Sequence, residues 1–266
     1  MAWRYRAQPR RPASNPGALR RDLAQLLRPL RRHRHRAQLI LAAPHSYLRW
    51  FTVQVPDAGR IPDAVQKQLL QLLPFDVTHA QFQFLVRRRQ QVGEQLECSV
   101  SVAACERAAL QHDLDALWEV GWVPNRVIPA ALALVRTAKA LGALDQDAAV
   151  LVEIGASRTV MVLVDAAEAV YARDVMFGED QLIEALTGQT SLGSVHVSLS
   201  REQAEALVRA EGIPEAASVT GLSGGPTVGR TPLSVAMYLA IIQPVLEQLV
   251  SEIRRTMTYG ADTVTA

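Results

Sequence analysis

The sequence predicts a mixed α/β protein, and three observations support this fold class. Hydrophobic residues make up 49% of the 266 residues, so the chain can bury the core of one large domain or of two modest ones. Residues 38–128 alternate between strand-like and helix-like patterns in the order β-β-α-β-β-α-β, which predicts a small two-layer unit. Residues 150–175 contain three successive strand-like runs without a helix between them, and helical patterns follow.

Periodicity and breaker residues define the elements of the first half. Prolines and a glycine interrupt residues 1–17, for which we expect a basic, disordered leader. Leucines at helical spacing then predict a helix over residues 19–30. After it we expect, in chain order, a buried strand at 37–44 joined by a turn to a second strand at 48–56, a proline-started helix at 61–73, strands at 80–89 and 95–104, a helix at 106–121 that ends in glycine, and a short strand and a helix within 123–142.

Charge is distributed unevenly along the chain. Residues 1–36 hold 11 of the 28 Lys and Arg residues and one of the 26 acids, a net charge of +10, whereas the remaining residues total 17 minus 25, or −8. A basic segment of this kind attracts anionic lipid headgroups or nucleic acid. It lacks the interleaved aromatic residues and the groove-reading helix of a specific nucleic-acid binder, so we expect no nucleic-acid partner. A solvated helix face is an equally open interpretation.

Composition also bounds the compartment. The chain starts without the apolar segment of a secretory signal. The longest apolar stretch, residues 233–253, carries two glutamines, two glutamates and a proline, and therefore predicts a helix outside the membrane. Cys98 and Cys105 have no Cys or His partners at ligand spacing, which indicates neither a disulfide framework nor a zinc site. We expect a cytoplasmic protein without a metal site.

The stretch VLVEIGASRTVMVLV, residues 150–164, contains the candidate ligand site. Residues after Gly155 are too strand-like for a Rossmann turn or P-loop, which run directly into a helix, so a β-hairpin is predicted. Backbone N–H groups of Gly155, Ala156 and Ser157, with the hydroxyls of Ser157 and Thr159, would form an anion nest for phosphate. The carboxylate of Glu153 would hold a metal ion or its water. A plain structural hairpin remains the alternative.

Further segments follow this hairpin in a characteristic order. A third strand ends near residue 175, helices are predicted at 178–186 and 200–211, and a long helix covers 232–259. Four segments together resemble the PilM family, the actin-like proteins of type IV pilus assembly: the hairpin, RDVMFGEDQLIEAL, SLSREQAEALV and SEIRRTM. This family is related to the division protein FtsA and to the L protein of type II secretion. The resemblance covers residues 19–259.

This resemblance implies an actin-like ATPase (ribonuclease H-like) fold of class α/β (α+β mixed), with an inserted small two-layer β-β-α-β-β-α subdomain. Pro74 and Phe75 match the family's segment in that subdomain. The implied organisation is a basic leader at 1–17, a first-lobe remnant with the inserted subdomain at 18–128, and a second actin-like lobe at 129–266.

The resemblance also implies a nucleotide site, which this sequence matches in part. Glu153 stands where the family has aspartate before Gly155, and Gly178 is followed by an acid where the family has a second glycine. Glu205 matches the acid of the family's Glu-x-x-Lys motif, but Val208 replaces the lysine, and the neighbouring Arg209 is expected to point elsewhere on the helix. The family's first Asp-x-Gly hairpin and its C-terminal Gly-Gly adenine loop have no counterpart, and TGLSGGP at 220–226 is expected to be a connection. We expect weak or absent binding of ATP and magnesium, and no catalytic residues.

The function implied by the resemblance is that of a scaffold in the type IV pilus inner-membrane assembly platform. Such a protein is cytoplasmic, peripheral at the inner membrane, and docks the short cytoplasmic tail of a PilN-like single-span inner-membrane protein beside other pilus platform proteins. Trp50, Trp118 and Trp122 are predicted to be core anchors of the inserted subdomain, with a peptide groove as the open alternative for one of them. The alternative functions are a working actin-like ATPase and the cytoplasmic part of a type II secretion L-type protein.

Overall fold

A computed structural model of the chain describes residues 16–41, 46–144, 148–166, 168–187, 190–192, 195–197, 199–213, 227–228, 231–232 and 235–265. The chain divides into two compact units, residues 1–149 with 164–172 and residues 150–163 with 173–266. Most of the predicted leader and the TGLSGGP connection lie outside the described residues. The predicted division at residue 129 stays a prediction.

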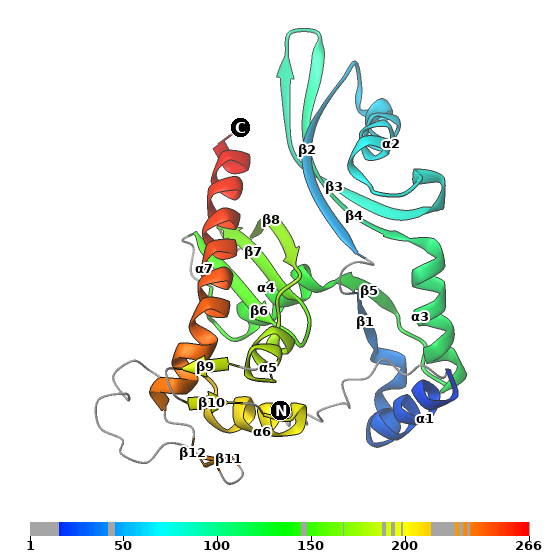
Figure 1. Cartoon of the computed structure of the whole chain (residues 1–266). Helices are drawn as coiled ribbons and strands as arrows, with labels where there is room; N and C mark the ends of the chain where they lie inside the picture. Colours follow the sequence, from blue (N-terminus) through cyan, green and yellow to red (C-terminus); the bar gives the residue numbers. More distant parts are fainter. Residues whose placement is uncertain are drawn as a thin grey trace. The chain divides into compact units, whose positions relative to one another are not determined.

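The first unit begins with a helix that changes type along its length (Figure 1). Helix α1, Pro16–Leu27, starts three residues before the predicted helix and includes the last two residues of the expected leader, because proline is well suited to a first helical turn. The 3₁₀ helix η1, Arg28–Arg36, follows. Pro29 has no N–H group to donate to a carbonyl four residues earlier, so the α-helix does not continue past it.

The inserted subdomain is a three-stranded antiparallel sheet covered on one face by a helix. Its strands are β2 (Tyr47–Val55), β3 (Ala80–Val92) and β4 (Gln95–Glu106), in the order β2-β4-β3, with α2 (Ile61–Leu72) as the second layer. Alternate residues of β4 meet the buried side of α2 in one core, as strand geometry requires. Short 3₁₀ turns, η2 (Ala58–Arg60) and η3 (Val77–His79), flank α2. A two-layer unit is thus confirmed for residues 47–106, whereas the strands at 38–41 and 126–129, which the prediction placed in the same unit, form a separate pair.

The first strand has a different partner from the predicted one. β1 (Gln38–Leu41) pairs in parallel with β5 (Arg126–Pro129), whereas β2 pairs with β4. Parallel strands need a long crossover, and here the whole inserted subdomain and the following helix lie between them. β1 was also expected to be buried, but only Leu41 is, and Ile40 is 55% exposed because this pair has just two strands among the described residues.

Two further helices complete this unit. α3 (Arg107–Glu119) packs beside α1, where Arg20 approaches Glu119, and α4 (Ala130–Ala140) follows β5. Gly121, with φ +79°, provides the left-handed residue that ends the α3 segment as predicted. Trp122 is buried, as a core anchor should be, but Trp118 is 47% exposed, so its predicted core role is wrong.

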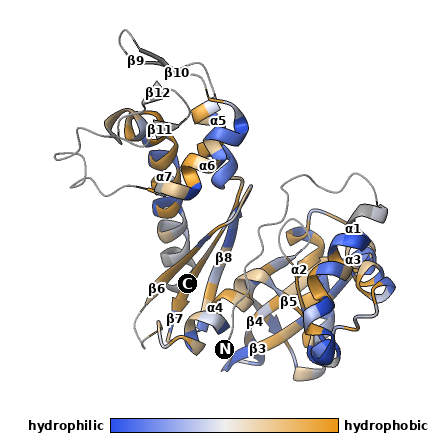
Figure 2. Cartoon of the chain, turned by 90° about the horizontal axis from the view of Figure 1, so that it is seen from below, coloured by the Kyte–Doolittle hydropathy of each residue, from blue (hydrophilic) through white to orange (hydrophobic). Residues whose placement is uncertain are grey.

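The three successive strands predicted at 150–175 form one sheet. They are β6 (Ala149–Ile154), β7 (Thr159–Asp165) and β8 (Glu168–Val175), in the order β6-β7-β8. Their connections are too short for parallel crossovers, so the strands are antiparallel. In Figure 2, β6 and β7 are mainly hydrophobic and β8 carries hydrophilic residues. The predicted hairpin is confirmed.

Helices account for most of the second unit. α5 (Glu179–Thr187), α6 (Arg201–Glu211) and α7 (Val235–Thr265) share a core in which Tyr238 and Ile242 are fully buried. Ser200 caps α6 with a reciprocal capping box. Short strand pairs, β9 (Thr190–Leu192) with β10 (Val195–Val197) and β11 (Thr227–Val228) with β12 (Thr231–Pro232), lie between these helices in the sequence. None of the described helices has both the length and the apolar composition needed to span a membrane.

Candidate functional site

The turn of the β6–β7 hairpin is joined by hydrogen bonds to the start of α5. The Gly155 N–H group donates to the Arg158 carbonyl oxygen at 2.8 Å and closes the turn. The carbonyl oxygens of Gly155 and Ala156 accept from the N–H groups of Glu179, at 3.0 Å, and Asp180, at 2.8 Å. The first N–H groups of a helix have no partner within the helix, so the turn acts as the cap of α5.

Packing around this turn is close. A Cβ atom at Gly178 would lie 2.7 Å from the Gly155 carbonyl oxygen and closer still to the Ala156 carbonyl, so only glycine fits. Thr159 is fully buried and its hydroxyl donates to the Phe177 carbonyl oxygen at 2.8 Å. The structure therefore brings four predicted site residues together, Gly155, Ala156, Thr159 and Gly178, in a packed joint between strand and helix.

Part of the predicted anion nest is used inside the protein. The Gly155 N–H group was expected to be available to phosphate, but it is bonded to Arg158, and the Thr159 hydroxyl is buried in its own bond. Ala156 and Ser157 are exposed, and their N–H groups have no backbone acceptor in the part of the chain that the structure describes. Glu153 is exposed as well, and the described residues include no cluster of three or more His, Cys, Asp or Glu that could hold a metal ion.

Glu205, the predicted ribose-binding acid, takes part in ion pairs on α6. Its carboxylate lies 3.2 Å from Arg201 Nε and 3.8 Å from Arg209 Nη2. Arg209 is exposed while its neighbour Val208 is buried, so the two point in different directions, and Arg209 pairs with Glu205 because residues four apart face each other on a helix. Arg201 also contacts the Asp180 carboxylate at 2.6 Å and so links α6 to the start of α5. Val208, in the family's lysine position, is buried in the helical core.

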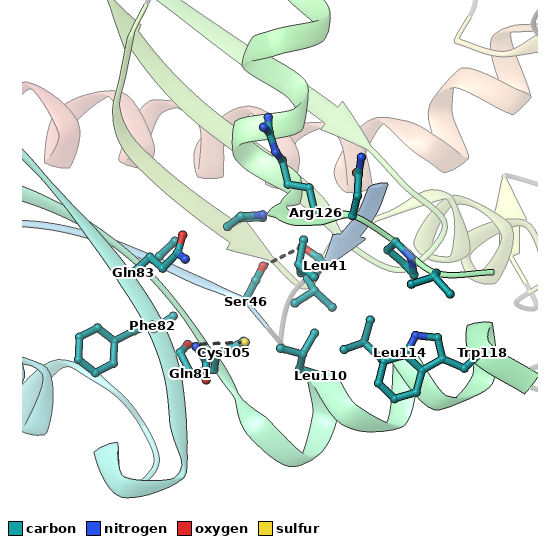
Figure 3. A pocket seen from close by; sticks show the side chains of 17 residues that line it. Leu41, Ser46, Gln81, Phe82, Gln83, Cys105, Leu110, Leu114, Trp118 and Arg126 are labelled. Carbon is teal, nitrogen blue, oxygen red and sulfur yellow. Dashed lines mark hydrogen bonds between the residues drawn. The ribbon is translucent and has the colours of Figure 1, made fainter. Parts of the chain in front are cut away.

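A hollow of about 590 Å³ lies in the first unit, where the β3–β4 pair meets α3 and the β1–β5 pair (Figure 3). Leu110, Leu114 and Trp118 extend from one face of α3 toward it, and Leu41 and Arg126 contribute from the parallel strand pair. Leu110 and Leu114 are half-buried and Trp118 is 47% exposed, so no element among the described residues covers the apolar stripe of α3 completely. The hollow therefore has one apolar wall, provided by a helix, and one mixed wall, provided by strands.

Polar groups in this hollow are few and several are internally bonded. The Ser46 hydroxyl donates to the Leu41 carbonyl oxygen at 2.8 Å, and Cys105 Sγ lies 3.7 Å from the Gln81 carbonyl oxygen. Burial raises the pKa of the Cys105 thiol, so it stays neutral and behaves as an apolar group. Among the described residues, β3 is an edge strand of its sheet. An apolar hollow beside an edge strand is suited to an extended peptide, which can add backbone hydrogen bonds at the edge.

The sequence did not identify this hollow as a candidate site. An amphipathic helix has the same pattern whether another element covers its apolar stripe or not, so the sequence predicts the helix but not how much of its stripe is covered. The nearest signal was the alternative, left open for one tryptophan, of lining a peptide groove; Trp118 lies in the wall of this hollow.

Comparisons with known proteins agree with this architecture. No family model matches the chain, and no curated protein matches it by sequence. Among solved structures, the PilM-PilN type IV pilus biogenesis complex matches with a TM-score of 0.71 and 21% identity over 95% of this chain and 68% of that chain. MreB5 of Spiroplasma citri bound to ADP matches with a TM-score of 0.48 and 12% identity over 94% of this chain and 61% of that chain. The cytoplasmic domain of EpsL, an inner-membrane component of the Vibrio cholerae type II secretion system, matches with a TM-score of 0.42 and 15% identity over 69% of this chain and 65% of that chain.

The chain thus has the actin-like α/β fold predicted from its sequence. Within that class, its structure is similar to the PilM-PilN type IV pilus biogenesis complex, so the resemblance to PilM is confirmed at the level of the fold.

Proposed function

We propose that this protein docks the short cytoplasmic tail of a PilN-like single-span inner-membrane protein in the hollow formed by α3, β3–β4 and the β1–β5 pair. The observation that carries the proposal is the half-buried apolar stripe of α3, with Trp118 exposed, in the wall of a hollow beside an edge strand. Further support comes from the likeness to a structure in which PilM is complexed with PilN. The protein then acts as a cytoplasmic scaffold of the pilus inner-membrane platform and meets other platform proteins there.

The chemistry of the hollow fits such a tail. Apolar side chains of the tail would pack on Leu110, Leu114 and Trp118, and each square ångström of apolar surface removed from water contributes about 25 cal/mol. Tail backbone groups would pair with the outer edge of β3. Tryptophan is among the residue types most often found as hot spots of binding, and Trp118 is an exposed tryptophan in the wall of this hollow.

ATP and magnesium do not fit the predicted site as a set. The Gly155 N–H group already donates to the Arg158 carbonyl oxygen, and the Thr159 hydroxyl donates to the Phe177 carbonyl oxygen. Glu205 is paired with two arginines. Two adjacent N–H groups, of Ala156 and Ser157, with the Ser157 hydroxyl, are the groups left for a phosphate. We infer weak or absent nucleotide binding, and a scaffold whose docking does not depend on nucleotide.

The basic segment supports a peripheral position at the inner membrane. Five exposed arginines lie in η1, where three residues per turn and a 2.0 Å rise per residue align Arg28, Arg31 and Arg34 in one row. Each cation near an anionic bilayer contributes about 1 kcal/mol. η1 runs into β1, whose Leu41 lines the hollow, so the proposed membrane contact and the tail site belong to the same unit.

Binding of a fluorescein-labelled tail peptide, taken from the PilN-like protein of the same genome, tests the docking proposal. Fluorescence anisotropy should show saturable micromolar binding to the wild type, and Trp118→Ala should weaken it at least tenfold. Leu70→Ala is the matched control, because Leu70 is an exposed apolar residue on α2 outside the hollow. Equal affinity of the Trp118→Ala variant and the wild type, with both folded by circular dichroism, would contradict the proposed site.

A further inference from the structure

A second hollow, of about 490 Å³, adjoins the first on the same sheet. It lies against β3 and β4, α4 and the start of β8, all within the first unit. Both hollows include Gln83 and Ala103 in their walls, and these two residues are directly opposed across the β3–β4 pair. Their side chains belong to the face away from α2, because their neighbours Phe82, Phe84 and Val102 contact the α2 core. The two hollows therefore form one trough along β3 and β4.

The second hollow is cationic where the first is apolar. Its wall contains Arg87, Arg136 and Lys139 with one carboxylate, Glu168, so three positive charges against one negative charge leave +2. Arg87 Nη1 lies 2.8 Å and Lys139 Nζ 3.2 Å from the Glu168 carboxylate. Arg136 is exposed and has no ion pair within the described ranges of the chain. Glu168 thus compensates one charge of the group and leaves an excess facing the trough.

Local backbone geometry places this charge. The register of β3 with β4 shifts between Val86 and Arg88, so Arg87 has no opposed residue there. A bulge of this kind redirects a side chain, and Arg87 reaches Glu168 and the Ala169 carbonyl oxygen. From Gln81 in the first hollow to Arg87 in the second, six strand residues span about 20 Å. An extended peptide beside β3 therefore needs about four to six residues between the two hollows.

We propose that the trough selects a tail with two features: apolar side chains for the first hollow, and an aspartate or glutamate four to six residues away for the cationic second hollow, with Arg136 as its main contact. The inference rests on the proposed docking function and specifies the tail that the site recognises. Charge complementarity at the second hollow favours the correct tail and register over purely apolar segments, which the first hollow alone would accept.

Peptide and protein variants together test this inference. The probe is the same labelled tail peptide, compared with a copy in which its acids are replaced by the corresponding amides, and the protein variants are Arg136→Glu and Arg254→Glu. Arg254 is the matched control, an exposed arginine on α7 in the other unit. At low salt, Arg136→Glu should weaken binding of the acidic tail about fivefold to tenfold and leave the amide tail unaffected, and 0.5 M salt should reduce the difference.

Each outcome separates this inference from the docking proposal. If wild-type protein binds the acidic and amide tails equally, or Arg136→Glu binds the acidic tail like the wild type, the acidic preference is refuted while docking in the first hollow stands. If neither tail binds the wild type at micromolar concentration, the docking function itself fails.

Discussion

Two regions of this molecule differ in how many of their polar and apolar groups are already bonded or packed within the protein. Around the β6–β7 turn, the groups expected to hold a nucleotide are bonded within the protein: Gly155 to Arg158, Thr159 to Phe177, and Glu205 to two arginines. Along the β3–β4 trough, the apolar stripe of α3 is only half-buried, with Trp118 exposed, and Arg136 has no ion pair among the described residues.

This difference shows how one fold separates structural from binding roles. A residue at a family's ligand position can serve packing, as Gly178 does beside the Ala156 carbonyl. Its presence is therefore weak support for the ligand, whereas an exposed tryptophan in the wall of an apolar hollow is the kind of surface on which we base the proposed docking. The hairpin joint is explained by folding, and the trough is the surface for which we propose a partner.

The largest effect is expected at Gly178. A Gly178→Ala variant should lose at least about 3 kcal/mol of unfolding free energy or fail to fold, because its Cβ would overlap two backbone carbonyls that cannot move without opening the hairpin joint. Urea denaturation followed by circular dichroism measures the loss. Gly93→Ala is the control: Gly93 has φ +61° with open space around it, so about 1 kcal/mol is expected. Similar losses at the two positions would show that the joint is not tightly packed.

A smaller loss is expected from Thr159→Val, which keeps the shape of the side chain and removes its hydroxyl. The Phe177 carbonyl oxygen would lose its buried donor, and unfolding free energy should fall by about 1–3 kcal/mol. Thr52→Val, at an exposed strand position, should change stability by less than about 0.5 kcal/mol. An unchanged Thr159→Val protein would mean that the hydroxyl is available for a ligand after all.

The Glu168 ion pairs make the unfolding free energy of the protein depend weakly on pH in the acidic range. Hydrogen bonds from Arg87 and then Lys139 lower the pKa of Glu168 below its ordinary 4.5, so the charged form is favoured in the folded protein. This stabilisation is complete above the unfolded-state pKa and is lost as pH falls below 4.5 through the lower folded pKa. Glu168 is 54% exposed, so the contribution should stay under about 1 kcal/mol. Between pH 5 and pH 3, the unfolding free energy of Glu168→Gln should fall less than that of the wild type, by up to about 1 kcal/mol. An equal fall in the two proteins would refute the ion pairs of Glu168.

The smallest change is expected at Trp50, in the wall of the second hollow. Its indole Nε1 is buried and has no hydrogen-bond partner among the described residues. Trp50→Phe removes that unsatisfied donor, and the gain of about 1–3 kcal/mol offsets the packing lost with the smaller ring. Thermal unfolding should therefore differ from that of the wild type by less than about 1 kcal/mol. A loss as large as that of Thr159→Val would indicate that the N–H group has a partner.

Elements with strong local signals could be predicted from the sequence. Proline at the start and end of α2 and Gly121 after α3 located these helices to within a few residues. The antiparallel order of β6, β7 and β8 followed from short connections. The partner of β1 could not be found, because β5 lies far along the chain and a strand pattern does not specify its neighbour.

The candidate site was less accessible to sequence reasoning. Spacing alone could have shown that Arg209 pairs with Glu205, since the two are four residues apart on a helix. The bonds from the hairpin turn to α5 depend on tertiary packing, which no motif records. The trough also joins distant segments, with Arg87, Arg136 and Glu168 brought together by a bulge, a helix and a strand.

Hydrogen–deuterium exchange of the full chain, with the tail peptide or with Mg-ATP, compares the two regions in one measurement. We predict that the tail slows exchange in residues 80–87 and 107–119, and that Mg-ATP at millimolar concentration leaves residues 153–159 and 178–181 unchanged. Protection of residues 153–159 by Mg-ATP, with no protection of residues 107–119 by the tail, would contradict the assignment of partner docking to the trough.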